Sequence, residues 1–252
     1  MVSHESGWLA PFFLIVALFY ASVGQAGASG YLAVMSLSGM TPASMKVTAL
    51  ALNLVVAGIG TFQFWRRGLF SLRTFYPFAV LGIPFSLLGG AIQLPSALYN
   101  PVVGLILILS AAQMLRSAWK KDTTQSGTMP PPPFIPALMT GGMIGFVSGM
   151  TGTGGGIFLA PIILAMKWVD LRHAAAVTAG YNLLNSGAAL LGAYSLLKFM
   201  PSALPLWIVA VAFGGYIGAA IGARYLPETA LRYILGLILV LSGIKLVLIG
   251  LR

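Results

Sequence analysis

The sequence predicts an all-α protein, a polytopic integral membrane bundle of two homologous repeats with roughly 8–10 membrane segments. Three observations predict this fold class. Hydrophobic residues make up 58% of the 252 residues and charged residues only 7%, whereas a soluble domain carries about 25% charged residues. Long runs contain no charged residue, and the second half of the chain repeats the first. This composition excludes a soluble enzyme, which needs a polar surface, and a disordered chain, which needs low hydrophobicity.

Runs without Asp, Glu, Lys or Arg locate the membrane segments, and Gly and Pro residues divide the longest runs. In chain order we predict helices at about 8–24, 29–39, 44–65, 75–92, 101–118, 135–149, 156–167, 173–195, 203–223 and 229–250. The segments at 29–39 and 156–167 are too short to cross a hydrocarbon core of about 30 Å. Together with the glycines before them, they indicate Gly-rich broken or re-entrant helices.

The chain divides at a polar, proline-rich segment. Residues 1–119 form the first transmembrane repeat, 120–134 a cytoplasmic linker and 135–252 the second transmembrane repeat. The linker begins with Lys120, Lys121 and Asp122 and ends in a proline run, which is typical of a solvated, fairly stiff connection. A proline-rich partner site is the alternative, but the lack of a basic PxxP context favours a plain linker.

The two halves are copies of one another. Residues 104–110 (GLILILS) recur at 236–242 (GLILVLS), with six of the seven residues identical. The same spacing along the chain pairs Gly82 with Gly214, and a slightly shorter spacing pairs Thr48 with Thr178. Ordered matches over a whole half indicate internal duplication, which is the usual construction of secondary transporters.

Positive charge indicates how the copies lie in the membrane, because cytoplasmic loops carry an excess of Lys and Arg. If the repeats are inverted, ten of the 14 Lys and Arg residues face the cytoplasm, and if they are parallel, nine do. Both arrangements place the Arg66–Arg73 loop and the 120–134 linker in the cytoplasm. The charge count barely separates the two, and we favour inversion because the short segments suit a re-entrant or broken-helix pair.

A glycine-rich break in each half is the strongest local feature. Residues 148–157 read SGMTGTGGGI, and their counterpart at 22–31 reads SVGQAGASGY. Consecutive glycines unwind a helix, since each costs about 1 kcal/mol relative to Ala. Unwound backbone in a membrane is tolerated only where it is buried in protein or lines a wet cavity. The helix that restarts after each break presents free N–H groups and a positive dipole end, which suit an anion.

These glycines have three other interpretations. Close helix packing explains an isolated Gly-xxx-Gly pair, but a duplicated Gly/Thr/Ser-rich break favours a binding site. A dinucleotide fingerprint needs a strand before its glycines, and the sequence predicts a helix there. A phosphate-binding P-loop needs Gly-Lys-Ser/Thr, which the sequence also lacks. We therefore expect the two breaks to bracket one central anion site, with N–H groups after Gly30 and Gly156 holding the anion.

Polar side chains in the third segment of each half extend the predicted site. They are Thr48, Asn53 and Gln63 in the first half and Thr178, Asn182, Asn185 and Ser186 in the second. Asn182 and Asn185 are three residues apart and share a helix face. Amides inside a membrane either line a pathway or bond neighbouring helices, and the sequence leaves both readings open. Thr48 and Thr178 are stronger candidates because they repeat.

Charged and reactive residues narrow the chemistry. All four acidic residues lie at segment ends or in loops, which argues against a carboxylate proton relay and a cation pump. Lys46 and Arg172 are positive elements for an anion path, although such residues are commonly interfacial anchors. With no cysteine, two distant histidines and no catalytic constellation, we expect no metal site, no cofactor and no enzyme. The net charge of +10 comes without a basic stripe interleaved with aromatics, so we expect no nucleic-acid partner.

The second glycine-rich break resembles the TauE/SafE family, through Gly152-x-Gly154-Gly155-Gly156, the following Pro161 and the helix that opens with Ala176-Val177-Thr178-Ala179. The resemblance covers nearly the whole chain. It implies a multi-pass transporter of the bacterial inner membrane for sulfur-containing anions such as sulfite, thiosulfate or small organosulfonates. In the first half, Ala26, Ala28 and Ser29 stand where more glycine is usual in the family.

Residues and resemblance together predict a secondary transporter that moves a small sulfur oxyanion or sulfonate by alternating access. The alternative is an anion channel or a structural membrane subunit in which the glycines only pack helices. The expected partners are the small anion and the lipid bilayer, and the sequence leaves the oligomeric state open, a homo-oligomer included. The predicted substrate-binding residues are Gln25, Gly27, Ala28, Ser29, Gly30, Thr48, Asn53, Thr151, Gly152, Thr153, Gly154, Gly155, Gly156, Thr178, Asn182 and Asn185.

Overall fold

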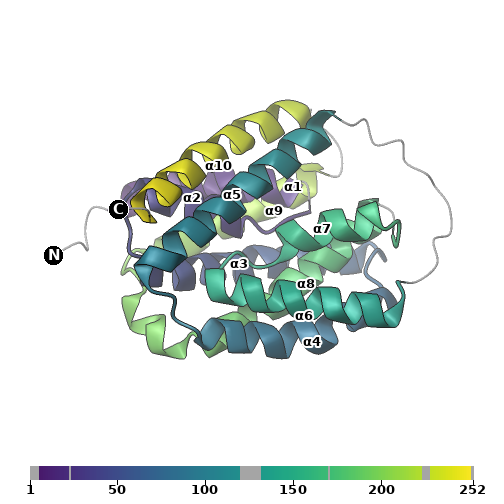
Figure 1. The fold of residues 1–252 in the computed structure, drawn as a ribbon. Helices are drawn as coiled ribbons and strands as arrows, with labels where there is room; N and C mark the ends of the chain where they lie inside the picture. The colour runs from purple at the N-terminus through teal and green to yellow at the C-terminus, as the bar shows by residue number, and fades with distance from the viewer. Residues whose placement is uncertain (1–5, 23, 120–131, 170, 223–227, 251–252) are drawn as a thin grey trace.

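The computed structural model describes residues 6–22, 24–119, 132–169, 171–222 and 228–250, and within them all regular structure is helical (Figure 1). The α-helices are α1 (Ala10–Ser22), α2 (Ala28–Leu37), α3 (Pro42–Arg66), α4 (Leu72–Ala91), α5 (Ser96–Trp119), α6 (Phe134–Thr151), α7 (Gly156–Ala165), α8 (Leu171–Gly192), α9 (Leu204–Gly222) and α10 (Glu228–Gly250). Short 3-10 helices occupy Ser6–Leu9 and Tyr194–Phe199. Residues 120–131 of the predicted linker lie outside the described residues.

Each of the ten predicted segments is found as a helix, which confirms the all-α prediction. The largest shift is in α5, which begins at Ser96 and carries Pro101 inside it. A proline inside a membrane helix is tolerated because neighbouring groups satisfy the backbone groups that it frees. Four helices in the described part of the chain, α3 to α6, contain a stretch long and apolar enough to cross a membrane. The protein is therefore a helical membrane protein.

Two helices are much shorter than their neighbours. α2 and α7 have ten residues each. At 1.5 Å per residue, such a helix is about 15 Å long and spans about half of the hydrocarbon core. Each begins directly after one of the glycine-rich breaks, at Ala28 and at Gly156. The N-termini of α2 and α7 therefore lie inside the molecule, and the break before each is buried.

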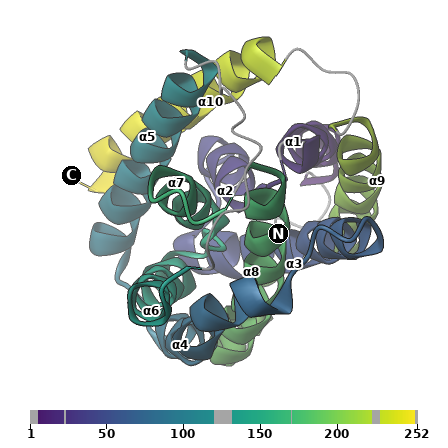
Figure 2. The ribbon, with the colours of Figure 1, turned by 90° about the vertical axis from the view of Figure 1, so that its right-hand side faces the viewer.

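Long helices of one half pack against long helices of the other half. α1 packs along α9 and α4 along α6, while α3 packs on α8 and α5 on α10. In Figure 2 these pairs surround the two short helices, α2 and α7. Exchanging the halves converts the α1–α9 pair into the α6–α4 pair and leaves the α3–α8 and α5–α10 pairs unchanged. The two halves thus pack through the same set of contacts.

The residues that meet across each helix pair show whether its two helices run parallel or antiparallel. Asn53 of α3 bonds Ser186 of α8, and Gly60 of α3 lies beside Ala179, so residue numbers rise on one helix as they fall on the other. α3 and α8 are therefore antiparallel, and the same reversal relates α5 to α10. The α1–α9 and α4–α6 pairs run parallel.

Glycines at the long-helix crossings have a packing role. Gly141, Gly145 and Gly149 recur every four residues on α6, and a Cβ on any of them would overlap the backbone of α4. Close approach of helix backbones through such small residues is common in membranes. The packing interpretation therefore holds for these glycines, which lie within a regular helix, and it leaves the glycines of the two breaks to be explained separately.

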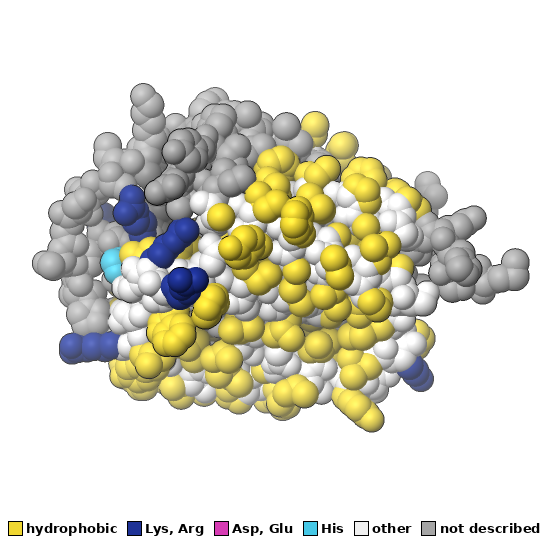
Figure 3. Space-filling view, turned by 180° about the vertical axis from the view of Figure 1, so that it is seen from behind, with side chains coloured by type: hydrophobic (Ala, Val, Ile, Leu, Met, Phe, Trp, Pro, Cys, Tyr) yellow, Lys and Arg dark blue, Asp and Glu magenta, His cyan; other side chains and the backbone are white. Residues whose placement is uncertain are grey.

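The surface separates into an apolar middle and a basic end. Seen from behind, hydrophobic side chains cover the middle of the molecule, and most of the visible Lys and Arg side chains gather at one end (Figure 3). Exposed arginines include Arg66, the last residue of α3, Arg67, which follows it, and Arg73 in the first turn of α4. Such a band of exposed apolar side chains is what a lipid-facing surface requires.

Candidate functional site

Each glycine-rich break contains glycines in the left-handed backbone conformation, with positive φ. Gly27, which precedes α2, has φ of 94°, and Gly155, which precedes α7, has φ of 85°. Positive φ also occurs at Gly24, Gly152 and Gly154. A side chain at such a position strains the backbone, and glycine adopts it freely. The first short helix begins at Ala28 rather than after Gly30, so the N–H groups at its start are those of Ala28 to Gly30.

An asparagine from the following long helix meets the start of each short helix. The Oδ1 atom of Asn53 on α3 accepts a hydrogen bond from the N–H of Ala28 at 3.1 Å. The Oδ1 atom of Asn182 on α8 accepts one from the N–H of Gly156 at 2.7 Å. Both asparagines are buried. A helix start leaves about four N–H groups without intrahelical partners, so each asparagine satisfies only part of the available donors.

Further hydrogen bonds surround the breaks, and one of them joins the two halves. The Nδ2 group of Asn53 donates to Ser186 Oγ on α8 at 2.8 Å. The Nδ2 group of Asn185 donates to Ser148 Oγ at 2.6 Å and to the carbonyl oxygen of Gly154 at 3.2 Å. The Oδ1 atom of Asn185 is buried without a hydrogen-bond partner among the described residues. The membrane amides therefore bond neighbouring elements, and Asn53 and Asn182 do so at the starts of the two short helices.

The two breaks converge on one small cavity. It is lined by Tyr20, Gln25, Ala26, Gly27, Ala28, Ser29, Asn53, Thr153, Ile157 and Asn182. Residues from both halves contribute, including both helix-start asparagines. The enclosed space is about that of one water molecule. A sulfur oxyanion is larger than water, so it would require the breaks to move apart.

Several predicted residues lie next to the cavity rather than on its wall. Thr151 Oγ1 is 3.0 Å from Thr153 Oγ1 and donates to the Val147 carbonyl. Gly30 packs against Val16 and Tyr20 of α1. Gly156 lies against the Asn182 side chain, so even a methyl group at Gly156 would overlap that amide.

Thr48 and Thr178 are both fully buried, and neither hydroxyl has a hydrogen-bond partner in the part of the chain that the structure describes. In the structure, Thr48 and Thr178 do not occupy equivalent positions, although the sequence repeat pairs them. Thr178 is four residues before Asn182 and so shares its helix face, whereas Thr48 is five residues before Asn53 and is turned by about 140° from it. The matching roles of the two asparagines pair Asn53 with Asn182, and in that register Ala49 and not Thr48 corresponds to Thr178.

Sequence reasoning missed some residues of the site. Tyr20 lines the cavity and its hydroxyl is 3.0 Å from Ser29 Oγ. An aromatic residue in an apolar helix carries no signal that separates such a role from ordinary packing. Ser148 and Ser186 are also bonded to the site asparagines. The sequence places Ser148 in the second break and Ser186 among the polar residues of the third segment, but neither is in the predicted binding set.

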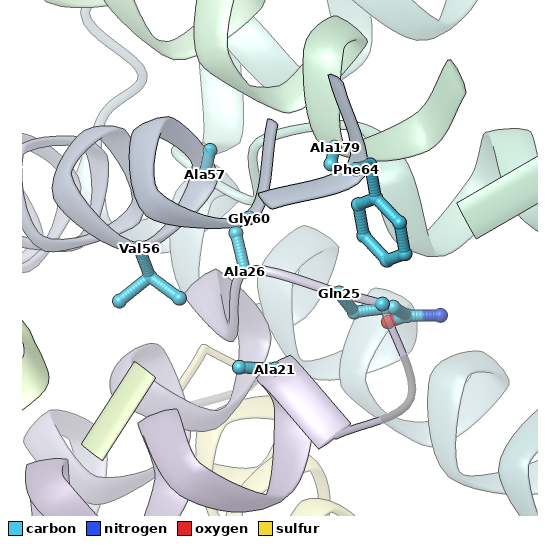
Figure 4. A pocket seen from close by; sticks show the side chains of 9 residues that line it. Ala21, Gln25, Ala26, Val56, Ala57, Gly60, Phe64 and Ala179 are labelled. Atoms are coloured by element: carbon cyan, nitrogen blue, oxygen red, sulfur yellow. The ribbon is translucent and has the colours of Figure 1, made fainter. Parts of the chain in front are cut away.

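A second pocket adjoins the cavity and shares Gln25 and Ala26 with it. Its lining consists of Ala21, Gly24, Gln25, Ala26, Val56, Ala57, Gly60, Phe64 and Ala179. Figure 4 shows Gln25 and Phe64 at one side of this pocket and Val56 and Ala57 at the other. Gly60 and Phe64 lie beyond Asn53 along α3, so the pocket lies toward the C-terminal end of that helix, where Arg66 and Arg67 are exposed. We call this pocket the vestibule.

The chain is similar in sequence to known proteins. Residues 9–246 match the family described as "Sulfite exporter TauE/SafE". The chain is 55% identical over 242 residues to "Probable membrane transporter protein y4hK" of Sinorhizobium fredii, which covers 96% of this chain and 98% of the relative. It is 25% identical over 236 residues to "Probable membrane transporter protein ORF9" of a Sinorhizobium species, covering 91% and 88%. No solved structure matches the chain.

Proposed function

Because the chain belongs to the sulfite exporter TauE/SafE family, and is therefore a multi-pass membrane transporter, we propose that it moves a small sulfur-containing anion across the bacterial inner membrane as a secondary transporter. Sulfite, thiosulfate and organosulfonates are the substrate class. The convergence of both glycine-rich breaks on one cavity is the observation that carries the proposal.

The chemistry of the cavity favours an anion. Two helices point their N-termini toward it, and helix N-termini present N–H donors and partial positive charge. Hydroxyl and amide groups of Ser29, Thr153 and Asn182 line the wall. These neutral donors bind a tetrahedral or pyramidal oxyanion through several oxygens without a fixed positive charge, so the substrate can leave. The matching arrangement in the two halves supplies donors from opposite sides.

The helix directions support inverted repeats. Under an inverted duplication, each helix of the first half is antiparallel to its counterpart in the second, and the α3–α8 and α5–α10 pairs have that relation. A two-fold axis in the membrane plane then passes through the cavity between the breaks. Alternating access follows when one half rocks against the other and opens first one end and then the other. Saturable uptake with counterflow in proteoliposomes tests the transporter against a channel, which shows no counterflow.

Inverted repeats predict a difference between two surface positions. The two variants Arg67→Cys and Lys198→Cys each place a single cysteine at an exposed basic position. The parent chain has no cysteine, so each variant carries only that thiol. Position 67 follows α3 and position 198 follows α8, which is antiparallel to α3. An impermeant thiol reagent applied to intact cells should label position 198 and leave position 67 unlabelled until the membrane is permeabilised. Equal protection of both positions in intact cells would contradict the inverted arrangement.

Thr178→Val should weaken binding of the sulfur anion. Valine keeps the shape of threonine but removes the buried, unpartnered hydroxyl one turn from Asn182. A hydrogen bond to a charged group contributes about 1.5–3 kcal/mol, so its loss should raise the dissociation constant about tenfold or more. Thr48→Val should have a smaller effect, because Thr48 lies on another face of its helix. Isothermal titration of sulfite measures both.

Thr61→Val is the matched control, because the Thr61 hydroxyl donates to the Ala57 carbonyl of its own helix. Its dissociation constant for sulfite should equal that of the parent. Thr178→Val should also keep the parent's thermal stability, since the hydroxyl that it removes has no hydrogen-bond partner among the described residues. Binding by Thr178→Val as tight as that of the parent would show that Thr178 only packs.

A further inference from the structure

Lys46 is a buried cation beside the second break. It lies on α3, and only 2% of it is exposed. Its Nζ group donates to the carbonyl oxygens of Gly89 at 3.4 Å, Gly90 at 2.9 Å and Ile92 at 2.8 Å, all at the C-terminal end of α4. All three partners are neutral oxygens. A charge buried in a membrane protein without an opposite charge is costly, and it commonly marks an ion pathway.

Lys46 lies on the same face of α3 as Asn53, which lines the central cavity. It is seven residues before Asn53, so the two share a face of α3 about two turns, or roughly 10 Å, apart. The Lys46 backbone also abuts Gly152, since a Cβ on that glycine would lie 3.1 Å from both the Cα atom and the carbonyl oxygen of Lys46. Lys46 thus closes the space next to the second break, on the side away from the vestibule.

The internal repeat shows what Lys46 adds. The register that pairs Asn53 with Asn182 also pairs Lys46 with Ala175. Ala175 abuts Gly24 of the first break, just as Lys46 abuts Gly152 of the second. Gly24, which abuts Ala175, lines the vestibule, and the vestibule shares Gln25 and Ala26 with the central cavity. At the Lys46 end, the long side chain bridges α3 to α4. The small Ala175 therefore lies at the end that has the vestibule, and the long cationic Lys46 lies at the opposite end.

We propose that Lys46 is the gate of the end opposite the vestibule and that its ammonium binds the anion when that gate opens. Movement of the α4 C-terminus away from α3 frees the ammonium from its three carbonyl partners. The uncompensated charge then takes the anion at a second position between the central cavity and the membrane surface. This inference rests on the proposed function, because the anion is the ligand that the charge recognises.

One reporter cysteine tests the gate. Thr153→Cys introduces a thiol of similar size into the wall of the central cavity of a chain without cysteine. A small impermeant thiol reagent is applied to right-side-out and to inside-out vesicles. With Lys46 present, the reporter should react from the vestibule side only. Lys46→Met, which keeps the length and removes the charge, should raise the reaction rate from the opposite side about tenfold or more, because three charged hydrogen bonds are lost.

Lys245→Met is the matched control. The Lys245 ammonium also donates to helix-end carbonyls, those of Ser36 at 2.8 Å and Leu37 at 2.9 Å, but these belong to the C-terminus of α2. It should leave the reporter protected from the opposite side. No increase with Lys46→Met, or an equal increase with Lys245→Met, would overturn the gate. This labelling result stands even if sulfite is not the substrate, so it fails separately from the proposed function.

Side-specific kinetics test the anion position. For sulfite that enters from the gated side, Lys46→Met should raise the half-saturating concentration about tenfold, and Lys46→Arg should restore most of the affinity. Sulfite that enters from the vestibule side should saturate at the parent's concentration. A purely structural role would change both directions together, and that result would overturn the second anion position.

Discussion

Asn182→Asp should abolish sulfite binding while the protein remains folded. An aspartate keeps the oxygen that accepts the Gly156 N–H, so the start of α7 keeps its partner. A carboxylate at a helix N-terminus is itself favourable for the helix. The new negative charge faces the cavity that Asn182 lines, where the substrate anion would sit. Repulsion of a few kcal/mol between like charges in a partly buried site weakens binding on the order of a hundredfold or more.

Asn182→Ala distinguishes the effect of added negative charge from the effect of losing the hydrogen bond to the Gly156 N–H. Alanine removes the acceptor and should cost about 1 kcal/mol of stability, as loss of a helix cap does. It adds no charge, so it should weaken sulfite binding less than aspartate does. Binding constants by titration and thermal stability of the purified proteins give both quantities. If alanine and aspartate weakened binding equally, the anionic nature of the ligand would be contradicted.

Gly156→Ala should abolish transport even though alanine is the better helix former. Alanine favours a helix over glycine by about 1 kcal/mol, so propensity alone predicts a more stable α7. In the structure, however, a methyl group at position 156 would overlap the Asn182 amide. The amide would have to leave the N–H that it accepts and the cavity that it lines. We expect sulfite uptake into proteoliposomes to fall to background, with normal insertion into the membrane.

Gly187→Ala is the matched control for this substitution. Gly187 lies in α8, and a Cβ there would meet Leu54 at 3.5 Å, which is ordinary contact. Transport by Gly187→Ala should equal that of the parent. Normal transport by Gly156→Ala would leave only the packing interpretation of the break and would favour a structural subunit over a transporter.

Much of the fold could be predicted from the sequence, because the bilayer imposes a strong rule. Every backbone group must be satisfied within a helix, so charge-free runs divided by Gly and Pro locate the helices closely. The short helices at Ala28 and Gly156 followed from the same rule, since a ten-residue apolar stretch cannot cross the core. The predicted start of α5 at residue 101 is five residues late, because Pro101 lies inside the helix and the helix begins at Ser96.

The site could be predicted less completely, because its contacts join distant parts of the chain. The glycines and amides were recognisable as types, but the partner of each was not. Asn53 meets Ala28 across 25 residues and Ser186 across 133 residues, and periodicity carries no signal at those distances. Repeat matching paired Thr48 with Thr178 by local identity, whereas the helix-start bonds fix a register one residue different. The contrast between Lys46 and Ala175 becomes visible only in that corrected register.

Thermal stabilisation by a panel of anions tests the central claim, that the paired breaks form an anion site for sulfur oxyanions. A ligand that binds only the folded protein stabilises it in proportion to RT ln(1 + [L]/Kd), so specific binding appears as a saturable rise in melting temperature. Sulfite, thiosulfate and a small organosulfonate are compared with chloride and phosphate, using the parent and Asn182→Asp. We expect saturable stabilisation of the parent by at least one sulfur anion and none for Asn182→Asp. No stabilisation of the parent by any sulfur anion, or equal stabilisation of both proteins, would contradict an anion site between the breaks.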